Sequence, residues 1–160
     1  MKHFSINEFT KSQTALAQGL ANTPTPAHMK NINELVHELL DPLREAWAIY
    51  CANEHIGTPA LIVTSGYRGF RLNEAVGGSQ TSAHCIGYAA DLVPRNGKLR
   101  EFKTFCREWL KTHQFDQMIS ESEDANGIPR WIHLGLKNSA GKHRKQFLTM
   151  RNGKYYSMSK

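Results

Sequence analysis

The clearest pattern in the chain is a stripe of apolar residues between positions 29 and 50, spaced three or four apart as on one face of an α-helix. The stripe consists of Ile32, Leu35, Leu39, Leu43, Ala46, Trp47 and Tyr50. Asp41-Pro42 falls inside the stripe. Since proline cannot donate a backbone hydrogen bond, either the helix kinks there or a new helix begins, with Asp41 as its cap and Pro42 in its first turn.

Other apolar patterns predict one more long helix and several strands. The helix covers residues 99–110, and shorter helical segments are expected near residues 5–9, 12–21 and 70–76. The predicted strands are 60–64, 88–93, 115–121 and 131–136, followed by a hairpin of 146–150 and 155–156 around Asn152-Gly153. Helices come first, and strands separated by short loops or one helix follow. This order predicts an α+β fold, with helices packed on a small antiparallel sheet.

The length and the lack of a long linker predict one domain. We divide its 160 residues into a helical part (1–57), a core (58–137) and a basic C-terminal hairpin (138–160). Hydrophobic residues make up 40% and charged residues 21% of the chain, a balance typical of a globular protein. We expect a monomer.

The formal net charge is +6, and basic residues are densest between Lys137 and Lys154. A cationic protein favours an anionic partner, such as nucleic acid, an acidic membrane or an acidic cell-wall polymer. Few aromatic residues accompany the basic ones and no nucleic-acid-binding motif is present, so we expect no nucleic-acid partner.

No apolar run approaches the roughly 18 residues that a membrane-spanning helix needs. The first residues, Met-Lys-His-Phe-Ser-Ile-Asn-Glu, lack the hydrophobic segment of a secretory signal. We therefore expect synthesis in the cytoplasm. The cysteines Cys51, Cys85 and Cys106 are odd in number and have no zinc-knuckle spacing, which favours free buried thiols over a disulfide.

The stretch Thr81-Ser-Ala-His84-Cys-Ile-Gly87-Tyr-Ala-Ala-Asp91 brings candidate chemistry into this framework. Gly87 allows a tight turn after His84, and the apolar run that follows predicts a buried strand carrying Asp91. Burying an unpaired carboxylate costs free energy. A metal ion is one partner that would offset this cost, with His84 as a second ligand.

A second histidine lies in the apolar strand Trp131-Ile-His133-Leu-Gly-Leu136. A lone histidine in such a strand is commonly a hydrogen-bonded core residue. Alternatively, His133 completes a His/Asp/His set with His84 and Asp91. Three nitrogen and oxygen ligands with a fourth position open to water are typical of a catalytic zinc site, with bonds of about 2.0–2.2 Å.

Three motifs stand in order along the chain: Ser65-Gly66-Tyr67-Arg68, then Ser82-x-His84-x-x-Gly87-x-Ala89-x-Asp91, then Trp131-Ile132-His133. Together they resemble the zinc D-Ala-D-Ala carboxypeptidase and peptidoglycan endopeptidase family, peptidase family M15. The segments 22–24 and 40–44 are also similar to its smaller phage and prophage members. The resemblance implies a single Hedgehog/DD-peptidase-like zinc peptidase domain in which His84, Asp91 and His133 bind Zn²⁺.

The resemblance also implies three residues for the substrate. Arg68 would bind the substrate's carboxylate or the oxyanion, a task that suits a permanently charged planar guanidinium. Tyr67 lies in the same motif and is expected to bind substrate. Ser82 is expected to hydrogen-bond either the substrate or a backbone group.

The general base is where this chain departs from some members of the family. They carry Glu or Asp three residues before the last histidine, whereas this chain has Arg130, which stays protonated. We favour Glu121 instead, because an antiparallel pairing of 115–121 with 131–136 would bring it near His133. Asp116 and Glu123 are the weaker alternatives, and a solvated glutamate at a strand end is the plain structural interpretation of all three.

These residues predict a zinc-dependent peptidase that cuts an amide bond in peptidoglycan stem peptides, as a carboxypeptidase or an endolysin-type endopeptidase. The cell wall would be reached through a holin-type exit or by delivery with a virion. The alternative is a catalytically silent binding or structural module that keeps the zinc on the same fold.

Overall fold

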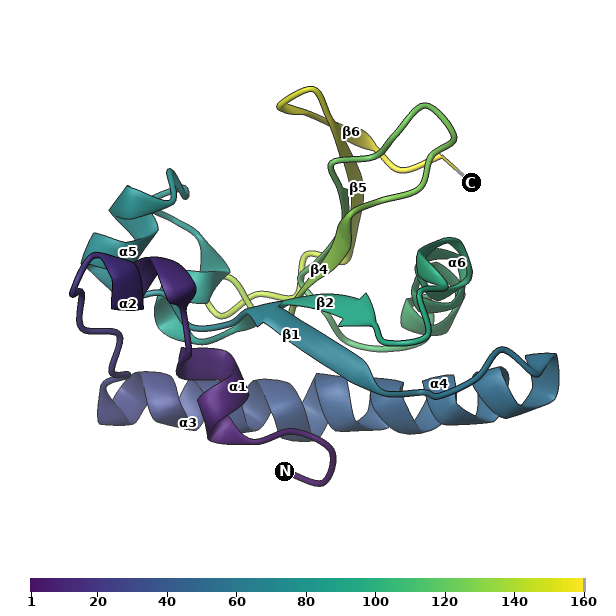
Figure 1. Cartoon of the computed structure of the whole chain (residues 1–160), viewed down its shortest axis with the longest axis horizontal. Helices are drawn as coiled ribbons and strands as arrows, with labels where there is room; N and C mark the ends of the chain where they lie inside the picture. The colour runs from purple at the N-terminus through teal and green to yellow at the C-terminus, as the bar shows by residue number, and fades with distance from the viewer. Residues whose placement is uncertain (160) are drawn as a thin grey trace.

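The computed structural model describes residues 1–159, and its longest element is one continuous helix along the base of the molecule (Figure 1). It consists of α3 (Pro26–Leu35), a π-helical turn η1 (Val36–Leu40) and α4 (Asp41–Glu54). Pro42 has no N–H to donate to the preceding turn. Just before it the backbone hydrogen-bond spacing widens from four residues to five, since the Asp41 N–H bonds the Val36 carbonyl. The helix therefore passes through Asp41-Pro42 by a π turn.

The Asp41 side chain does not cap this helix. It is buried and accepts the backbone N–H of Lys2 at 2.9 Å and of His3 at 3.1 Å. Both donors belong to the N-terminal segment, 39 and 38 residues before Asp41 in the sequence. The carboxylate therefore holds the N-terminal segment against the long helix, a role that local sequence does not indicate.

The remaining helical segments are short except for one. They are α1 (Ile6–Thr10), α2 (Gln13–Ala17), α5 (Phe70–Ala75), the 3₁₀ turn η2 (Ala83–Ile86) and the longer α6 (Leu99–Leu110). The extent of α6 is the predicted one, whereas α2 is shorter than predicted. No helix in the described part of the chain is long and apolar enough to cross a membrane.

Six strands form one sheet in the order β1-β2-β4-β3-β5-β6. Their bounds are β1 (Leu61–Ser65), β2 (Ala89–Pro94), β3 (Gln117–Glu121), β4 (Trp131–Gly135), β5 (Gln146–Arg151) and β6 (Lys154–Ser157). All neighbours are antiparallel except β3 and β5, which are parallel. The α+β prediction is confirmed, but the sheet is mixed. After β4 the chain turns back and passes over to the far side of β3, so β5 runs in the direction of β3.

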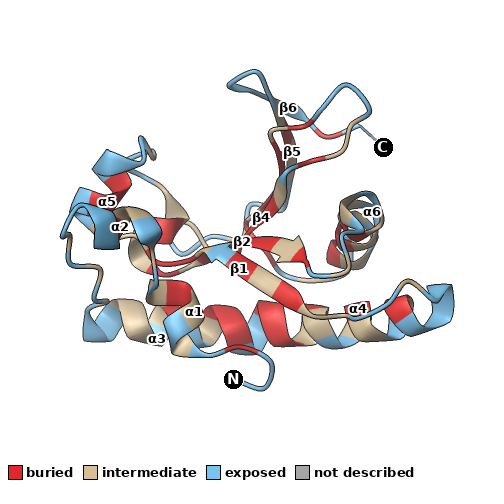
Figure 2. Ribbon diagram, in the orientation of Figure 1, coloured by how far each residue is buried: buried red, intermediate tan, exposed pale blue. Residues whose placement is uncertain are grey.

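Alternation along the strands gives the sheet two different faces. Ile132 and Leu134 of β4 and Leu92 of β2 are fully buried in one core with the long helix and α6. Trp47 and Phe102 meet there edge to face, with ring centroids 5.0 Å apart. Figure 2 shows buried residues along the part of the long helix that passes beneath the sheet. The intervening residues of the same strands point to the other face.

The C-terminal hairpin of β5 and β6 forms as predicted, but two basic residues of this part of the chain pair with buried acids. Arg144 makes two bonds to Asp116, of 2.7 and 2.8 Å, and Arg151 bonds Glu123 at 2.9 Å. Lys137, before the hairpin, pairs with Glu34. These ion pairs tie the C-terminal part of the chain to the core, and they weaken the argument from net charge for an anionic partner.

The three cysteines are free, as predicted. Cys51 and Cys106 are buried and Cys85 is half-buried. Burial raises the pKa of each thiol above its ordinary value, so all three are in the unreactive neutral form at neutral pH.

The contact between the N-terminal segment and the turn after β1 gives a test of the packing. The Tyr67 N–H donates to the Phe9 carbonyl at 2.6 Å, and a Cβ added to Gly66 would lie 2.5 Å from the Phe9 Cα. We expect Gly66→Ala to lower the free energy of unfolding by about 1–3 kcal/mol, the usual cost of overpacking. Urea unfolding followed by circular dichroism measures the change.

Gly69→Ala is the matched control three residues away. A Cβ there would meet Asn22 Oδ1 at 3.5 Å, an ordinary contact, and the Gly69 φ of −60° suits alanine. Equal unfolding midpoints for the two variants would contradict the close approach at Gly66.

Candidate metal centre

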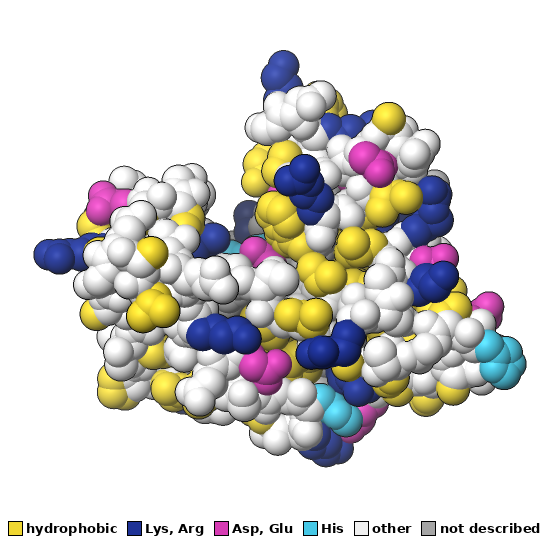
Figure 3. Space-filling model, viewed as in Figure 1, with side chains coloured by type: hydrophobic (Ala, Val, Ile, Leu, Met, Phe, Trp, Pro, Cys, Tyr) yellow, Lys and Arg dark blue, Asp and Glu magenta, His cyan; other side chains and the backbone are white. Residues whose placement is uncertain are grey.

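The face of the sheet opposite the helices forms the floor of a cleft of about 550 Å³. One wall is the segment from Gly77 to His84, and the other includes the β5–β6 hairpin. Figure 3 shows this hollow between the lobe of α2 and α5 and the upright hairpin, with acidic and histidine side chains at its base. The residues predicted to bind metal and substrate, except Tyr67, line this cleft.

Three elements bring the predicted metal ligands together. Asp91 of β2 and His133 of β4 are direct partners in the antiparallel register, and both point away from the core. His84 reaches the same place from η2, the turn that precedes β2. All three side chains are buried, and their ligand atoms lie within 4.8 Å of one another. Within residues 1–159 no other group of three or more such side chains is present.

The spacing of these atoms fits a tetrahedral metal ion. Asp91 Oδ1 lies 3.2 Å from His84 Nε2 and 3.1 Å from His133 Nδ1, and the two nitrogens are 3.2 Å apart. An ion bound tetrahedrally at about 2.0 Å holds its ligand atoms about 3.3 Å from each other. The triangle is therefore close to one face of a zinc coordination tetrahedron.

Hydrogen bonding gives His84 the tautomer that a metal ligand needs. Its Nδ1 lies 2.7 Å from the Gly66 carbonyl, and a carbonyl can only accept, so Nδ1 carries the proton. In the neutral ring the Nε2 lone pair then points toward Asp91 and His133. Acceptor atoms directed at one point repel each other unless a cation lies between them. A hydrogen bond from the other ring nitrogen to a backbone carbonyl, as His84 makes to Gly66, is the usual support of a metal-bound histidine.

Asp91 is in the ionised form that binds metal. Burial opposes its ionisation, but the adjacent His84 and His133 outweigh that effect, so the pKa of Asp91 lies below its ordinary value. The buried carboxylate is therefore an anionic ligand, and a cation bound beside it would offset the cost of its burial.

Ser82 joins the metal centre to Arg68. Its Oγ accepts the Arg68 Nη2–H at 3.1 Å and the His84 backbone N–H at 3.2 Å. The Arg68 N–H in turn donates to the His84 carbonyl at 3.1 Å. Of the two expectations for Ser82, the backbone contact is present, and the hydroxyl also orients the guanidinium.

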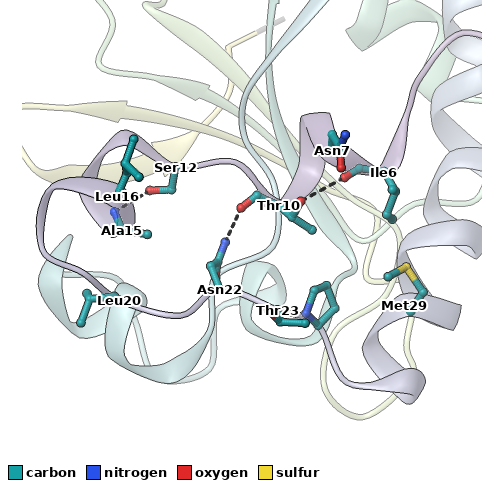
Figure 4. Close-up of a pocket in the computed structure, with 11 residues that line it drawn as sticks. Ile6, Asn7, Thr10, Ser12, Ala15, Leu16, Leu20, Asn22, Thr23 and Met29 are labelled. Atoms are coloured by element: carbon teal, nitrogen blue, oxygen red, sulfur yellow. Dashed lines mark hydrogen bonds between the residues drawn. The ribbon is translucent and has the colours of Figure 1, made fainter.

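Asn22 holds the backbone on both sides of Arg68, and sequence reasoning assigned it no role. Its Nδ2 donates to the carbonyls of Tyr67 and Thr10, each at 2.9 Å, and its Oδ1 accepts the Gly69 N–H at 2.8 Å. Figure 4 shows the Asn22 amide turned toward Thr10 beside a pocket of about 420 Å³. The only signal in the sequence was the position of Asn22 in the segment 22–24; the contact spans 45 residues.

Tyr67 lies beneath the cleft and is not part of its lining. The ring is buried, and its hydroxyl lies 3.0 Å from His28 Nδ1. This position favours a role in supporting the Arg68 turn over the predicted contact with substrate.

Glu121 is the further carboxylate that lines the cleft beside the cluster of His84, Asp91 and His133. It closes β3, pairs with Trp131 of β4, and is buried. Burial raises the pKa of Glu121 to about 7, against the influence of His133 and Arg68. A carboxyl group with a pKa near neutrality can both take and return a proton.

The two alternative bases are engaged elsewhere. Asp116 is almost fully buried and bound by two nitrogens of Arg144. Glu123 bonds Lys103 at 2.6 Å and also Arg151, and it does not line the cleft. Both carboxylates hold the hairpin in place, so their positions leave Glu121 as the acid beside the metal cluster. Arg130 is exposed.

The comparisons with known proteins agree with this geometry. No curated protein matches the chain. A family model described as Peptidase M15 matches residues 2–134, which includes His84, Asp91 and His133. Because the match covers most of the chain, this protein belongs to the peptidase M15 family.

Proposed function

We propose that the protein is a zinc-dependent peptidase that hydrolyses an amide bond in peptidoglycan stem peptides. The observation that carries this proposal is the buried His84–Asp91–His133 triangle, whose spacing fits a tetrahedral ion, beside Glu121 in one cleft of an M15 family member. The family supports a metallopeptidase. The resemblance of the three motifs to peptidoglycan peptidases supports the substrate.

His84, Asp91 and His133 would hold the ion through two nitrogens and one oxygen, the donor set of catalytic zinc sites. Zinc bound there supplies Lewis acidity, which polarises a carbonyl and lowers the pKa of water. Because all three ligands line the cleft, a peptide in the cleft would have direct access to the ion.

Glu121 and Arg68 have separate roles in the proposed reaction, proton transfer and binding of negative charge. The Glu121 carboxylate takes a proton from the attacking water and returns it to the amine nitrogen as the C–N bond breaks. Arg68, oriented by Ser82 and by the Asn22 contacts, holds the carboxylate of the substrate or the developing oxyanion.

Glu121 also supports an enzyme over a catalytically silent zinc module. That alternative arose because Arg130 occupies the position of an acid in some relatives. Glu121 provides an acid from the neighbouring strand, and burial has already moved its pKa to about 7. A silent module has no need of a buried carboxyl group at this place.

The proposal includes a phage or prophage origin and a monomeric state. It also includes action on the cell wall after a holin-type exit or delivery with a virion. They rest on the resemblance of the motifs. Either a terminal D-Ala or an internal bond of the stem peptide is compatible with Arg68, and the products distinguish the two.

Digestion of purified peptidoglycan tests the proposal. We expect soluble peptide fragments whose masses, measured by mass spectrometry, identify one cleaved amide bond. A chelator should abolish the activity and Zn²⁺ should restore it, whereas Mg²⁺, which prefers oxygen ligands in octahedral geometry, should not. Bound zinc without any cleavage would favour the silent module, and activity that survives metal removal would refute the metal centre.

A Glu121→Gln variant tests the base. We expect it to bind zinc with unchanged stoichiometry and to lose about 10²–10⁴-fold in kcat, the usual contribution of a general base. Metal analysis and initial rates on the same preparation measure both quantities.

Glu108→Gln is the matched control, at an exposed position of α6 outside the lining of the cleft. Its carboxylate pairs with Lys111 at the surface, so the change should leave zinc content and turnover as in the wild type. If Glu121→Gln kept near-normal turnover, Glu121 would not be the base.

The acidic limb of the pH profile should report the same group. A base works in its deprotonated form, so kcat/KM should fall about tenfold per pH unit below its pKa. Burial raises the Glu121 pKa from its ordinary 4.5 to about 7, and a bound cation opposes this rise. We therefore expect the limb between pH 4.5 and 7, with zinc content measured at each pH; a loss of rate that follows loss of zinc would assign the limb to the ligands.

A further inference from the structure

The β5–β6 hairpin contributes residues to the cleft although it lies beyond the family match, which ends at residue 134. It stands upright at the edge of the sheet (Figure 1), where β5 is the neighbour of β3. Leu148, Met150 and Tyr155 of the hairpin line the cleft. In Figure 3 hydrophobic side chains gather on this wall of the hollow. The hairpin wall therefore faces the metal cluster from the side opposite Arg68 and Ser82.

The strand register decides which tyrosine of β6 faces the cleft. Tyr155 pairs with Met150, and Tyr156 pairs with Thr149. Directly opposed residues lie on the same face of a sheet, so Tyr155 is on the face of Met150, in the cleft. Tyr156 is on the opposite face and does not line the cleft.

The backbone at Tyr155 is held to β5 by its pairing with Met150. β5 is in turn paired in parallel with β3 from Gln117 to Ser120. Glu123 bonds Arg151 at 2.9 Å and the Thr149 hydroxyl at 3.3 Å. Since Glu121 ends β3, these contacts set where the backbone of Tyr155 lies relative to Glu121.

The Tyr155 hydroxyl is available to a ligand and lies close to the charged groups of the site. Among the described residues it has no hydrogen-bond partner, and 59% of the residue is exposed. Burial raises the pKa of the hydroxyl above its ordinary value, and the charges of Glu121 and Asp91 add to this rise while Arg68 opposes it. The phenol is therefore a neutral donor within the electrostatic reach of all three.

We propose that Tyr155 is a further catalytic residue, whose O–H donates a hydrogen bond to the scissile carbonyl oxygen as that oxygen gains negative charge. A fixed donor aimed at developing charge stabilises the transition state more than the ground state. With this contact on the hairpin wall, Arg68 on the opposite wall is left to bind the carboxylate of the peptide. The proposal rests on the peptidase activity proposed above.

Tyr155→Phe tests the proposal, with Tyr156→Phe as the control from the other face of the hairpin. We expect Tyr155→Phe to lower kcat by about 10-fold to 100-fold, at the lower end for an oxyanion donor because the bound metal shares the charge. Its KM should stay within about threefold of wild type, and zinc content and thermal unfolding should not change. Tyr156→Phe should match wild type in every measurement.

Binding of a phosphinate analogue of the scissile dipeptide gives a readout besides turnover. This tetrahedral anion should bind Tyr155→Phe more weakly by the same factor as the loss in kcat/KM. Equal kcat for the two tyrosine variants, or a loss confined to KM, would overturn the role of Tyr155 in an enzyme that is otherwise active. An inactive wild-type protein would instead overturn the proposed function and this inference with it.

Discussion

A buried carboxylate between two histidines is the interaction on which the rest of the site depends. Asp91 lies in a strand among small apolar residues, where an isolated negative charge would be costly. His84 and His133 lie within 3.2 Å of Asp91 Oδ1, and a cation held by the three side chains would offset that cost. The same three atoms form a triangle that a tetrahedral cation fits. The need to compensate the buried Asp91 charge thus accounts for the positions of its neighbours, His133 on the paired strand β4 and His84 on the turn before β2.

The two-faced sheet lets a small protein meet this requirement without weakening its core. Along β4, Ile132 and Leu134 pack into the core, while Trp131 and His133, which alternate with them, face the cleft. A shift of the register by one residue would place histidine in the core and leucine in the cleft. The pairings of β4 with β2 and β3 therefore serve both apolar burial and the grouping of Asp91 and His133.

Polar contacts from distant parts of the chain complete the site. The Gly66 carbonyl sets the tautomer of His84, and Asn22 holds the backbone around Arg68. Asp116 and Glu123, acids that resembled candidate bases, instead bind Arg144 and Arg151 of the C-terminal part. In this way Asp116 and Glu123 hold the hairpin wall of the cleft, and Glu121 alone of the three candidate acids lines the cleft itself.

The sequence by itself predicted the main elements, the α+β class and the grouping of His84, Asp91 and His133, because each depends on periodicity, short motifs or strand pairing. It favoured Glu121 among three acids, but only the structure shows that Asp116 and Glu123 do not line the cleft and are paired with basic residues. Only the tertiary structure decided the parallel β3–β5 pair, the π turn before Pro42, and the partners of Asp41, Asn22 and Tyr67. These features depend on contacts between residues far apart in the chain, such as the 45 residues between Asn22 and Tyr67. The local conformational preferences of the residues do not predict such contacts. Tyr155 belongs to the same group, since only the register of the hairpin shows which of two adjacent tyrosines faces the metal cluster.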